Sequence, residues 1–205
     1  AIGSGALAGA LDSTDGADES SGSIAIGKSA GAAITTGSRN TAIGYQALDA
    51  TTTGSDNTII GYQAGTTLPA ASNRNTAVGT YSLKAGNNSS CEDNVMVGYN
   101  TGAAITDGQN NVCVGASAGE ALTTAGGNVV LGTFALDAGT GGLTSNVAIG
   151  YHAMGTINEG TNSGSGVVNV DHNIALGYQA FLGGSFGSNS DSTDRQSLGN
   201  VAIGA

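Results

Sequence analysis

The chain has 205 residues, of which 36 are glycine, none is tryptophan and only 10% are charged. Its formal charge of −10 at pH 7 repels phosphate, so we expect no binding to nucleic acid. No apolar run approaches the ~20 residues that span a bilayer, so we also expect no membrane insertion by this segment. Since the sequence lacks an initiator Met and a signal-peptide pattern, we expect a processed product or a piece of something longer.

One stretch, Asn-Thr-Ala-Ile-Gly-Tyr-Gln-Ala-Leu at 40–48, returns nearly unchanged at 57–64 and 173–180. Alignment on the central glycine gives eleven copies, anchored at Gly3, Gly27, Gly44, Gly61, Gly79, Gly98, Gly115, Gly132, Gly150, Gly177 and Gly204. We predict a single repeat domain over 1–205, with regular rungs of 17 to 19 residues at about 24–154. Longer insertions interrupt the period at 4–23, 155–172 and 181–199.

The residues just before each anchor glycine predict a strand. The residue directly before it is always a large aliphatic, and the residue three positions before it is β-branched in ten copies. The residue between them is mostly small and never polar. Because β-branched residues favour strands, whose alternate residues face opposite sides, each copy is expected to form a short strand with two apolar faces. Stacked in register, the copies predict an all-β parallel β-solenoid of about eleven rungs.

Asparagine stands four positions before the anchor glycine in nine copies, and Ser23 takes its place in another. Stacked asparagines can hydrogen-bond from rung to rung. We therefore predict a structural ladder rather than a catalytic site, formed by Asn40, Asn57, Asn75, Asn94, Asn111, Asn128, Asn146, Asn173 and Asn200.

After the glycine, a second short strand is expected, and five of the six tyrosines directly follow an anchor glycine. A three-strand coil of hexapeptides is excluded because no aliphatic column lies six residues beyond the first one. A flat two-strand roll cannot bury both faces of a strand by itself, so we expect a homo-oligomer, most simply a homotrimer. The sequence does not say which face lines the axis.

The columns resemble the YadA-like head repeats of trimeric autotransporter adhesins, most closely Asn-Val-Ala-Ile-Gly at 146–150 and 200–204. The similarity covers essentially the whole chain, although the rungs are longer than those of that family. The Gly-Tyr-Gln-Ala-Leu repeat is also similar to the repeat shafts of phage tail fibres. The resemblance implies a left-handed β-roll homotrimer, placed outside the cell on a bacterial surface or a virion appendage. It implies a shaft and adhesin that attaches to a glycan or protein receptor on a host surface.

No nucleophile with a base and an orienting group stands out, so we predict that the chain is not an enzyme. Two acidic loops, Asp12 to Glu19 and Asp191 to Asp194, carry oxygen ligands of the kind that coordinate calcium, but their spacing does not match an EF-hand. We therefore predict no cofactor, with calcium as the alternative. Two buried or free thiols are expected at Cys91 and Cys113, with an interchain bridge as the alternative.

Insertions in solenoids form surface loops that often bind partners. The candidate receptor contacts in the last two insertions are Ile157, Val168, His172, Phe186 and Arg195, although these loops could instead pack on the trimer itself. The alternative function is ice binding through a column of threonines that lie eight residues after the anchor glycines. Pro69 and Asn87 interrupt this column, which comprises Thr35, Thr52, Thr106, Thr123 and Thr140.

Overall fold

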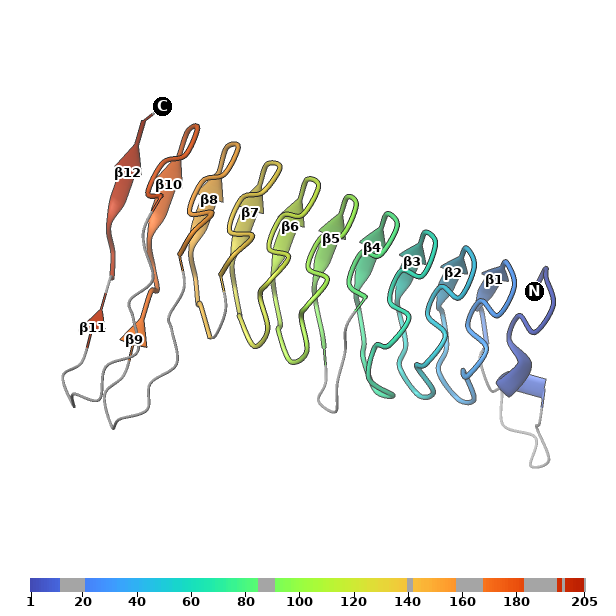
Figure 1. Cartoon of the computed structure of the whole chain (residues 1–205). Helices are drawn as coiled ribbons and strands as arrows, with labels where there is room; N and C mark the ends of the chain where they lie inside the picture. The colour runs from blue at the N-terminus through green and yellow to red at the C-terminus, as the bar shows by residue number, and fades with distance from the viewer. Residues whose placement is uncertain are drawn as a thin grey trace.

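The computed structural model describes residues 1–11, 21–84, 91–139, 142–157, 168–182, 195–196 and 198–204. These residues form a parallel β-solenoid in which each turn contributes one short strand. The turns stack along a rod whose two termini lie at opposite ends (Figure 1). The prediction of an all-β parallel solenoid is confirmed.

A single parallel sheet runs along the rod, and its ten strands follow one another in chain order over the described residues. They are β1 (Ile24–Ile26), β2 (Thr41–Ile43), β3 (Thr58–Ile60), β4 (Thr76–Val78), β5 (Val95–Val97), β6 (Val112–Val114), β7 (Val129–Leu131), β8 (Val147–Ile149), β10 (Ile174–Leu176) and β12 (Val201–Ile203).

The regular part of the solenoid lies between β1 and β8. Seven turns of 17 to 19 residues join β1 to β8, and two turns of 27 residues follow. The first copy adds no strand to the sheet: it joins β1 through the isolated bridge Ile2↔Ile26 and continues into the 3-10 helix η1 (Ala8–Leu11). The eleven predicted rungs are therefore about seven regular turns with irregular ends.

The strands pair position for position because every copy carries the same columns. Val112 of β6 pairs with Val95 of β5 and with Val129 of β7, for example. The middle residue of each strand points into the coil and is fully buried from β1 to β10, whereas its two neighbours face outward and are half-buried or exposed. The inward column consists of Ala25, Ala42, Ile59, Ala77, Met96, Cys113, Val130, Ala148 and Ala175.

The predicted second strand is absent, and this prediction was wrong. The residues after each anchor glycine form a turn in which two backbone positions are left-handed, as at Gln46 (φ 51°) and Leu48 (φ 53°). A strand would send consecutive side chains to opposite faces, but Ala47 and Leu48 are adjacent and both fully buried. The turn thus delivers two neighbouring side chains to the core.

A further core column closes the coil opposite the sheet. It lies seven residues after the anchor glycine, two residues beyond the position at which the sequence shows no aliphatic column. Its large members are buried against the inward face of the sheet and comprise Ile34, Leu68, Ile105, Leu122 and Ile157. Each turn therefore has its own small core, which continues into the turns above and below.

The anchor glycine is required by both its conformation and its neighbours. Gly98, with φ 140°, lies in a region that L residues rarely adopt, and a Cβ placed there would lie 2.5 Å from the carbonyl oxygen of Gly115. The same approach recurs at each anchor from Gly27 to Gly177. Only glycine lets the stacked backbones come this close.

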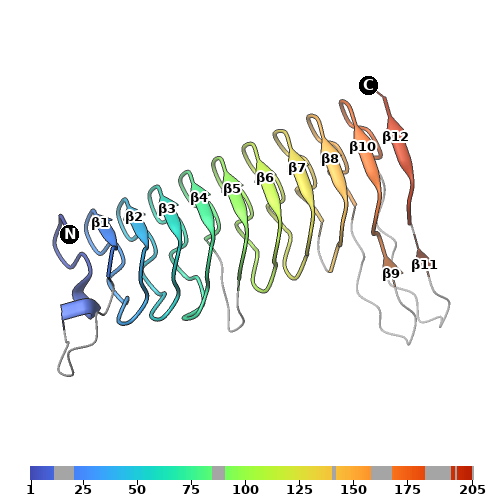
Figure 2. The same ribbon diagram turned by 180° about the vertical axis from the view of Figure 1, so that it is seen from behind.

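The last two insertions contribute a second parallel sheet, β9 (Val168–Asn169) with β11 (Arg195–Gln196). Both views place it beside the lower ends of β10 and β12 (Figures 1 and 2). Within the described residues there is no helix of the length and apolarity that crossing a membrane requires.

Candidate binding surface

The asparagine column lies inside the rod. The side-chain oxygen of Asn111 accepts hydrogen bonds from the backbone N–H (3.1 Å) and side-chain amide (2.9 Å) of Asn128. Its own amide donates to Asn94 Oδ1 (3.1 Å) and to the Ala125 carbonyl (2.8 Å). The chain of amide contacts runs from Asn40 to Asn200. Asparagine holds this position because it donates and accepts at once, across turns and within the turn.

The outward face of the main sheet exposes a row of large aliphatic side chains. It carries the aliphatic residue before each anchor glycine and the β-branched residue two positions earlier. Ile24 is 51% exposed, Val114 38% and Ile149 36%. Both faces of each strand are apolar in the sequence, which does not say which of them lines the axis of an oligomer. In the structure the middle residue of each strand faces the interior of the coil, and the two residues beside it face outward.

An aromatic column borders this face at the carboxyl ends of the strands. Tyr45 and Tyr62 stack with ring centroids 5.3 Å apart, and Tyr151 and Tyr178 stack at 5.5 Å. Edge contacts extend the two pairs into two blocks. The blocks are interrupted at Ala116–Ser117, and the column comprises Tyr45, Tyr62, Tyr81, Tyr99, Phe134, Tyr151 and Tyr178. Most of these rings are exposed along one side of the rod.

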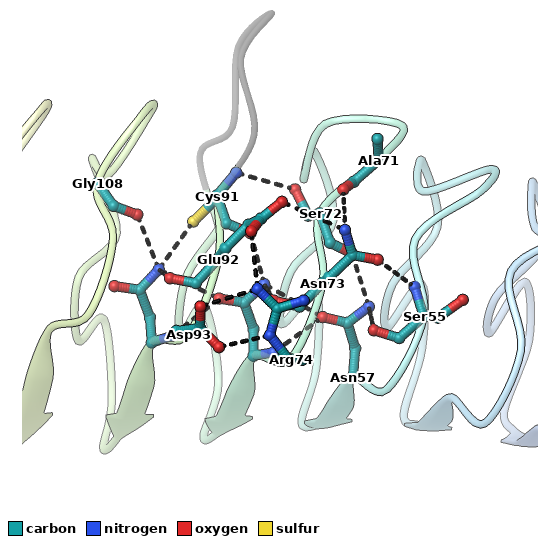
Figure 3. Close-up of polar contacts among 12 residues, drawn as sticks. Ser55, Asn57, Ala71, Ser72, Asn73, Arg74, Cys91, Glu92, Asp93 and Gly108 are labelled. Carbon is teal, nitrogen blue, oxygen red and sulfur yellow. Dashed lines mark hydrogen bonds and ion pairs between the residues drawn. The ribbon is translucent and has the colours of Figure 1, made fainter.

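A polar corner precedes the asparagine ladder in most turns. The guanidinium of Arg39 donates to Asp56 across one turn (2.6 Å). Figure 3 shows the next such cluster, in which Arg74 donates to both Asp93 (2.6 Å) and Glu92 (2.8 Å). The hydrogen bonds from arginine hold the pKa of Asp56 and Asp93 below their usual range. These exposed pairs tie neighbouring turns together at the surface.

The five predicted receptor-contact residues do not form one surface among the described residues. Ile157 is fully buried in the column seven residues after an anchor glycine, so its assignment as a contact residue was wrong. His172 is exposed, in a left-handed conformation (φ 60°) just before the asparagine ladder. Val168 and Arg195 are paired residues of the small sheet. Phe186 lies outside the described residues. Only the pairing of Val168 with Arg195 brings two of these positions together.

The threonine column forms hydrogen bonds between turns. The hydroxyl groups of Thr35 and Thr106 donate to the backbone carbonyls of Thr52 (3.2 Å) and Thr123 (3.3 Å) in the next turn. All four are half-buried, and Thr140 lies outside the described residues. A flat threonine surface for ice would need these hydroxyl groups to face solvent.

The remaining candidate groups offer little reactivity. Cys91 and Cys113 are buried free thiols, and burial raises the pKa of each to about 12, which keeps them protonated. Both acidic loops, Asp12 to Glu19 and Asp191 to Asp194, lie outside the described residues. Among the residues that the structure does describe, no group of three potential metal ligands is present.

The class that the structure defines is a parallel β-solenoid repeat protein. No family model matches the chain, and neither a curated protein nor a solved structure is significantly similar to it. The likeness to adhesin heads and fibre shafts therefore depends on the repeat columns themselves.

Proposed function

We propose that this chain is a non-enzymatic segment of a trimeric adhesive fibre. It serves as a structural shaft and attaches to a glycan or protein receptor on a host or other surface. It lies outside the cell, in a virion appendage such as a phage tail fibre or on a bacterial surface. The left-handed winding that the repeat resemblance implies is part of this proposal.

The observation that carries the proposal is the uncovered outward face of the main sheet. Ten three-residue strands at ~4.8 Å spacing make a strip of roughly 450 Å² before the aromatic column is added. Its outward side chains are aliphatic apart from Thr41, Thr58 and Thr76. The largest apolar patch of a typical soluble monomer covers about 300–600 Å² and is often a binding surface. Covering the strip removes the large aliphatics from water and stabilises the assembly by about 25 cal/mol per Å² of apolar area.

A second and third copy of the same chain suit this strip. Every turn repeats at the same rise, so identical rods placed side by side present apolar rows at matching intervals. Closed cyclic symmetry is the common arrangement of identical subunits. The number three comes from the resemblance to trimeric fibres, while the need for a partner comes from the exposed strip.

The adhesive part of the proposal is supported by the aromatic column. Tyrosines combine an apolar ring with a polar tip, and they are enriched where proteins bind partners. Their repetition along a rigid rod, multiplied by three chains, offers many weak contacts whose combined strength exceeds that of each one.

Light scattering on the purified chain tests the assembly. We expect three times the mass of one chain. Val114→Lys, which places a charge on the outward strip without touching the core, should give monomers that keep their β-sheet spectrum. Thr36→Lys, at an exposed turn position, should leave the trimer intact. A parent chain that is a monodisperse monomer at micromolar concentration would contradict the trimer.

Adhesion is tested separately with the labelled chain. We expect saturable binding to the surface of bacterial or animal cells, reduced by an excess of unlabelled chain. Failure to bind across a panel of bacterial and animal cells would reject the adhesive role while leaving the shaft in place.

A further inference from the structure

The polar corner of the rod contains an open hollow of about 410 Å³ beside β6, β7 and β8. It exists because Gly126 and Gly127 place no side chains between those of the turns on either side. Gly126 belongs to a line of bridged residues, Asn73, Glu92, Gln109, Gly126 and Thr144, in which it is the only glycine. One turn of the corner is therefore missing its side chains.

Most side chains around the hollow have no hydrogen-bond partner among the described residues; the exception is Thr144, whose hydroxyl group donates to the Gly142 carbonyl (2.7 Å). Asp107, Gln109, Asn110, Thr124 and Ser145 line it, and within the described residues their side chains make no hydrogen bond or ion pair. The hollow thus gathers a carboxylate, two amides and two hydroxyl groups that are free to bind a ligand.

A few turns earlier, the side chains at the same corner are paired with one another. There Arg39 is paired with Asp56. Arg74 is paired with Asp93 and Glu92 (Figure 3). Asn73 also donates to Glu92 (3.3 Å). Unpaired polar groups are therefore not a general property of this corner: they accompany the missing side chains of Gly126 and Gly127.

We infer that this hollow binds one neutral saccharide unit of a surface glycan, an inference that names the receptor class and rests on the adhesive function proposed above. Amides and hydroxyl groups both donate and accept, and the carboxylate accepts, which suits a ring bearing several hydroxyl groups. No lysine or arginine lines the hollow, and the chain carries a net charge of −10, so acidic sugars are disfavoured.

The size and openness of the hollow fit one unit of a longer chain. Its volume lies near the lower end of the ~300–1,000 Å³ typical of small-ligand sites. Because it opens to solvent, the rest of the glycan can continue outside. A single carboxylate is a poor calcium site, since that ion takes six to eight oxygen ligands, so binding should not need a metal.

The test uses the full chain on an array of oligosaccharides that end in glucose, galactose, mannose, N-acetylglucosamine or sialic acid. We expect binding to one or more of the neutral termini, unchanged by EDTA. Gly126→Gln fills the hollow and should weaken binding at least tenfold. Its backbone is not left-handed, and the added Cβ would lie an ordinary 3.6 Å from the Gln109 carbonyl oxygen.

Two further variants keep the result interpretable. Asp107→Ala removes an exposed carboxylate without adding volume and should also weaken binding at least tenfold, even if Gly126→Gln does not fold. Asn73→Gln, at the equivalent bridge position outside the hollow, should bind like the parent.

The outcomes separate this inference from the adhesive function. Neutral-glycan binding that survives both Gly126→Gln and Asp107→Ala overturns the hollow and leaves the adhesive function standing. Preference for sialic acid, or loss of binding in EDTA, overturns it as well. A chain that binds cells but no neutral glycan rejects only the hollow, whereas a chain that binds neither rejects the hollow and the adhesive function together.

Discussion

Removing one rung of the asparagine ladder should destabilise the rod strongly. Asn111→Ala deletes every side-chain hydrogen bond of this residue: its two amide hydrogens are shared among three acceptors, and its oxygen accepts two bonds. The Ala125 carbonyl and the Asn128 backbone N–H then lose these buried bonds. Leaving a buried polar group unpaired costs about 1–3 kcal/mol, so we expect a loss of roughly 3–5 kcal/mol. That is a large part of the about 5–15 kcal/mol that stabilises a folded domain.

Urea unfolding followed by circular dichroism measures this loss. Gln109→Ala, two residues away and exposed, is the matched control and should change stability by less than about 0.5 kcal/mol. Asn111→Ser should fall between the two, because Ser23 already occupies the ladder and accepts from the Asn40 backbone N–H (3.1 Å). If Asn111→Ala cost no more than the control, the ladder would contribute nothing net to stability and the reasoning would be refuted.

Two further predictions concern the backbone and the thiols. Gly98→Ala should prevent folding, because the added Cβ collides with the next turn. Gly204→Ala, which has open space around it, should fold normally. Solubility and circular dichroism measure both, and a folded Gly98→Ala variant would contradict the prediction. The pKa of the thiols is about 12 in the folded chain and roughly 9 in the unfolded chain. Their contribution to the free energy of unfolding is therefore complete below pH ~9. Above it, stability should fall by about 1.4 kcal/mol per pH unit for each thiol. Urea titrations at pH 8 and 10 should show Cys113→Ala halving that loss, and an equal loss in the variant would contradict the assignment.

The repeat columns alone were enough to predict much of this fold. A β-branched residue, a small residue and a large aliphatic before each glycine define a strand, because side chains of a strand alternate. Their recurrence every 17 to 19 residues predicts stacking, because a single turn cannot bury its apolar side chains without the turns on either side. The asparagine column likewise predicts contacts between turns, because its side chain both donates and accepts. These are local properties of the sequence, and they recur in so many copies that a substitution in one copy does not obscure the pattern.

The tertiary structure decided how each turn closes and what it leaves exposed. The column of Ile34, Leu68 and Ile105 was missed because Thr51 and Gly139 interrupt it and no strand period leads to it. The turn at Gln46 to Leu48 was mistaken for a strand because left-handed φ angles at non-glycine residues leave no sequence signal. The hollow at Gly126 depends on which side chains meet across neighbouring turns. Sequence columns reveal that a position recurs, but only packing determines whether its side chain faces the core, a neighbouring turn or solvent.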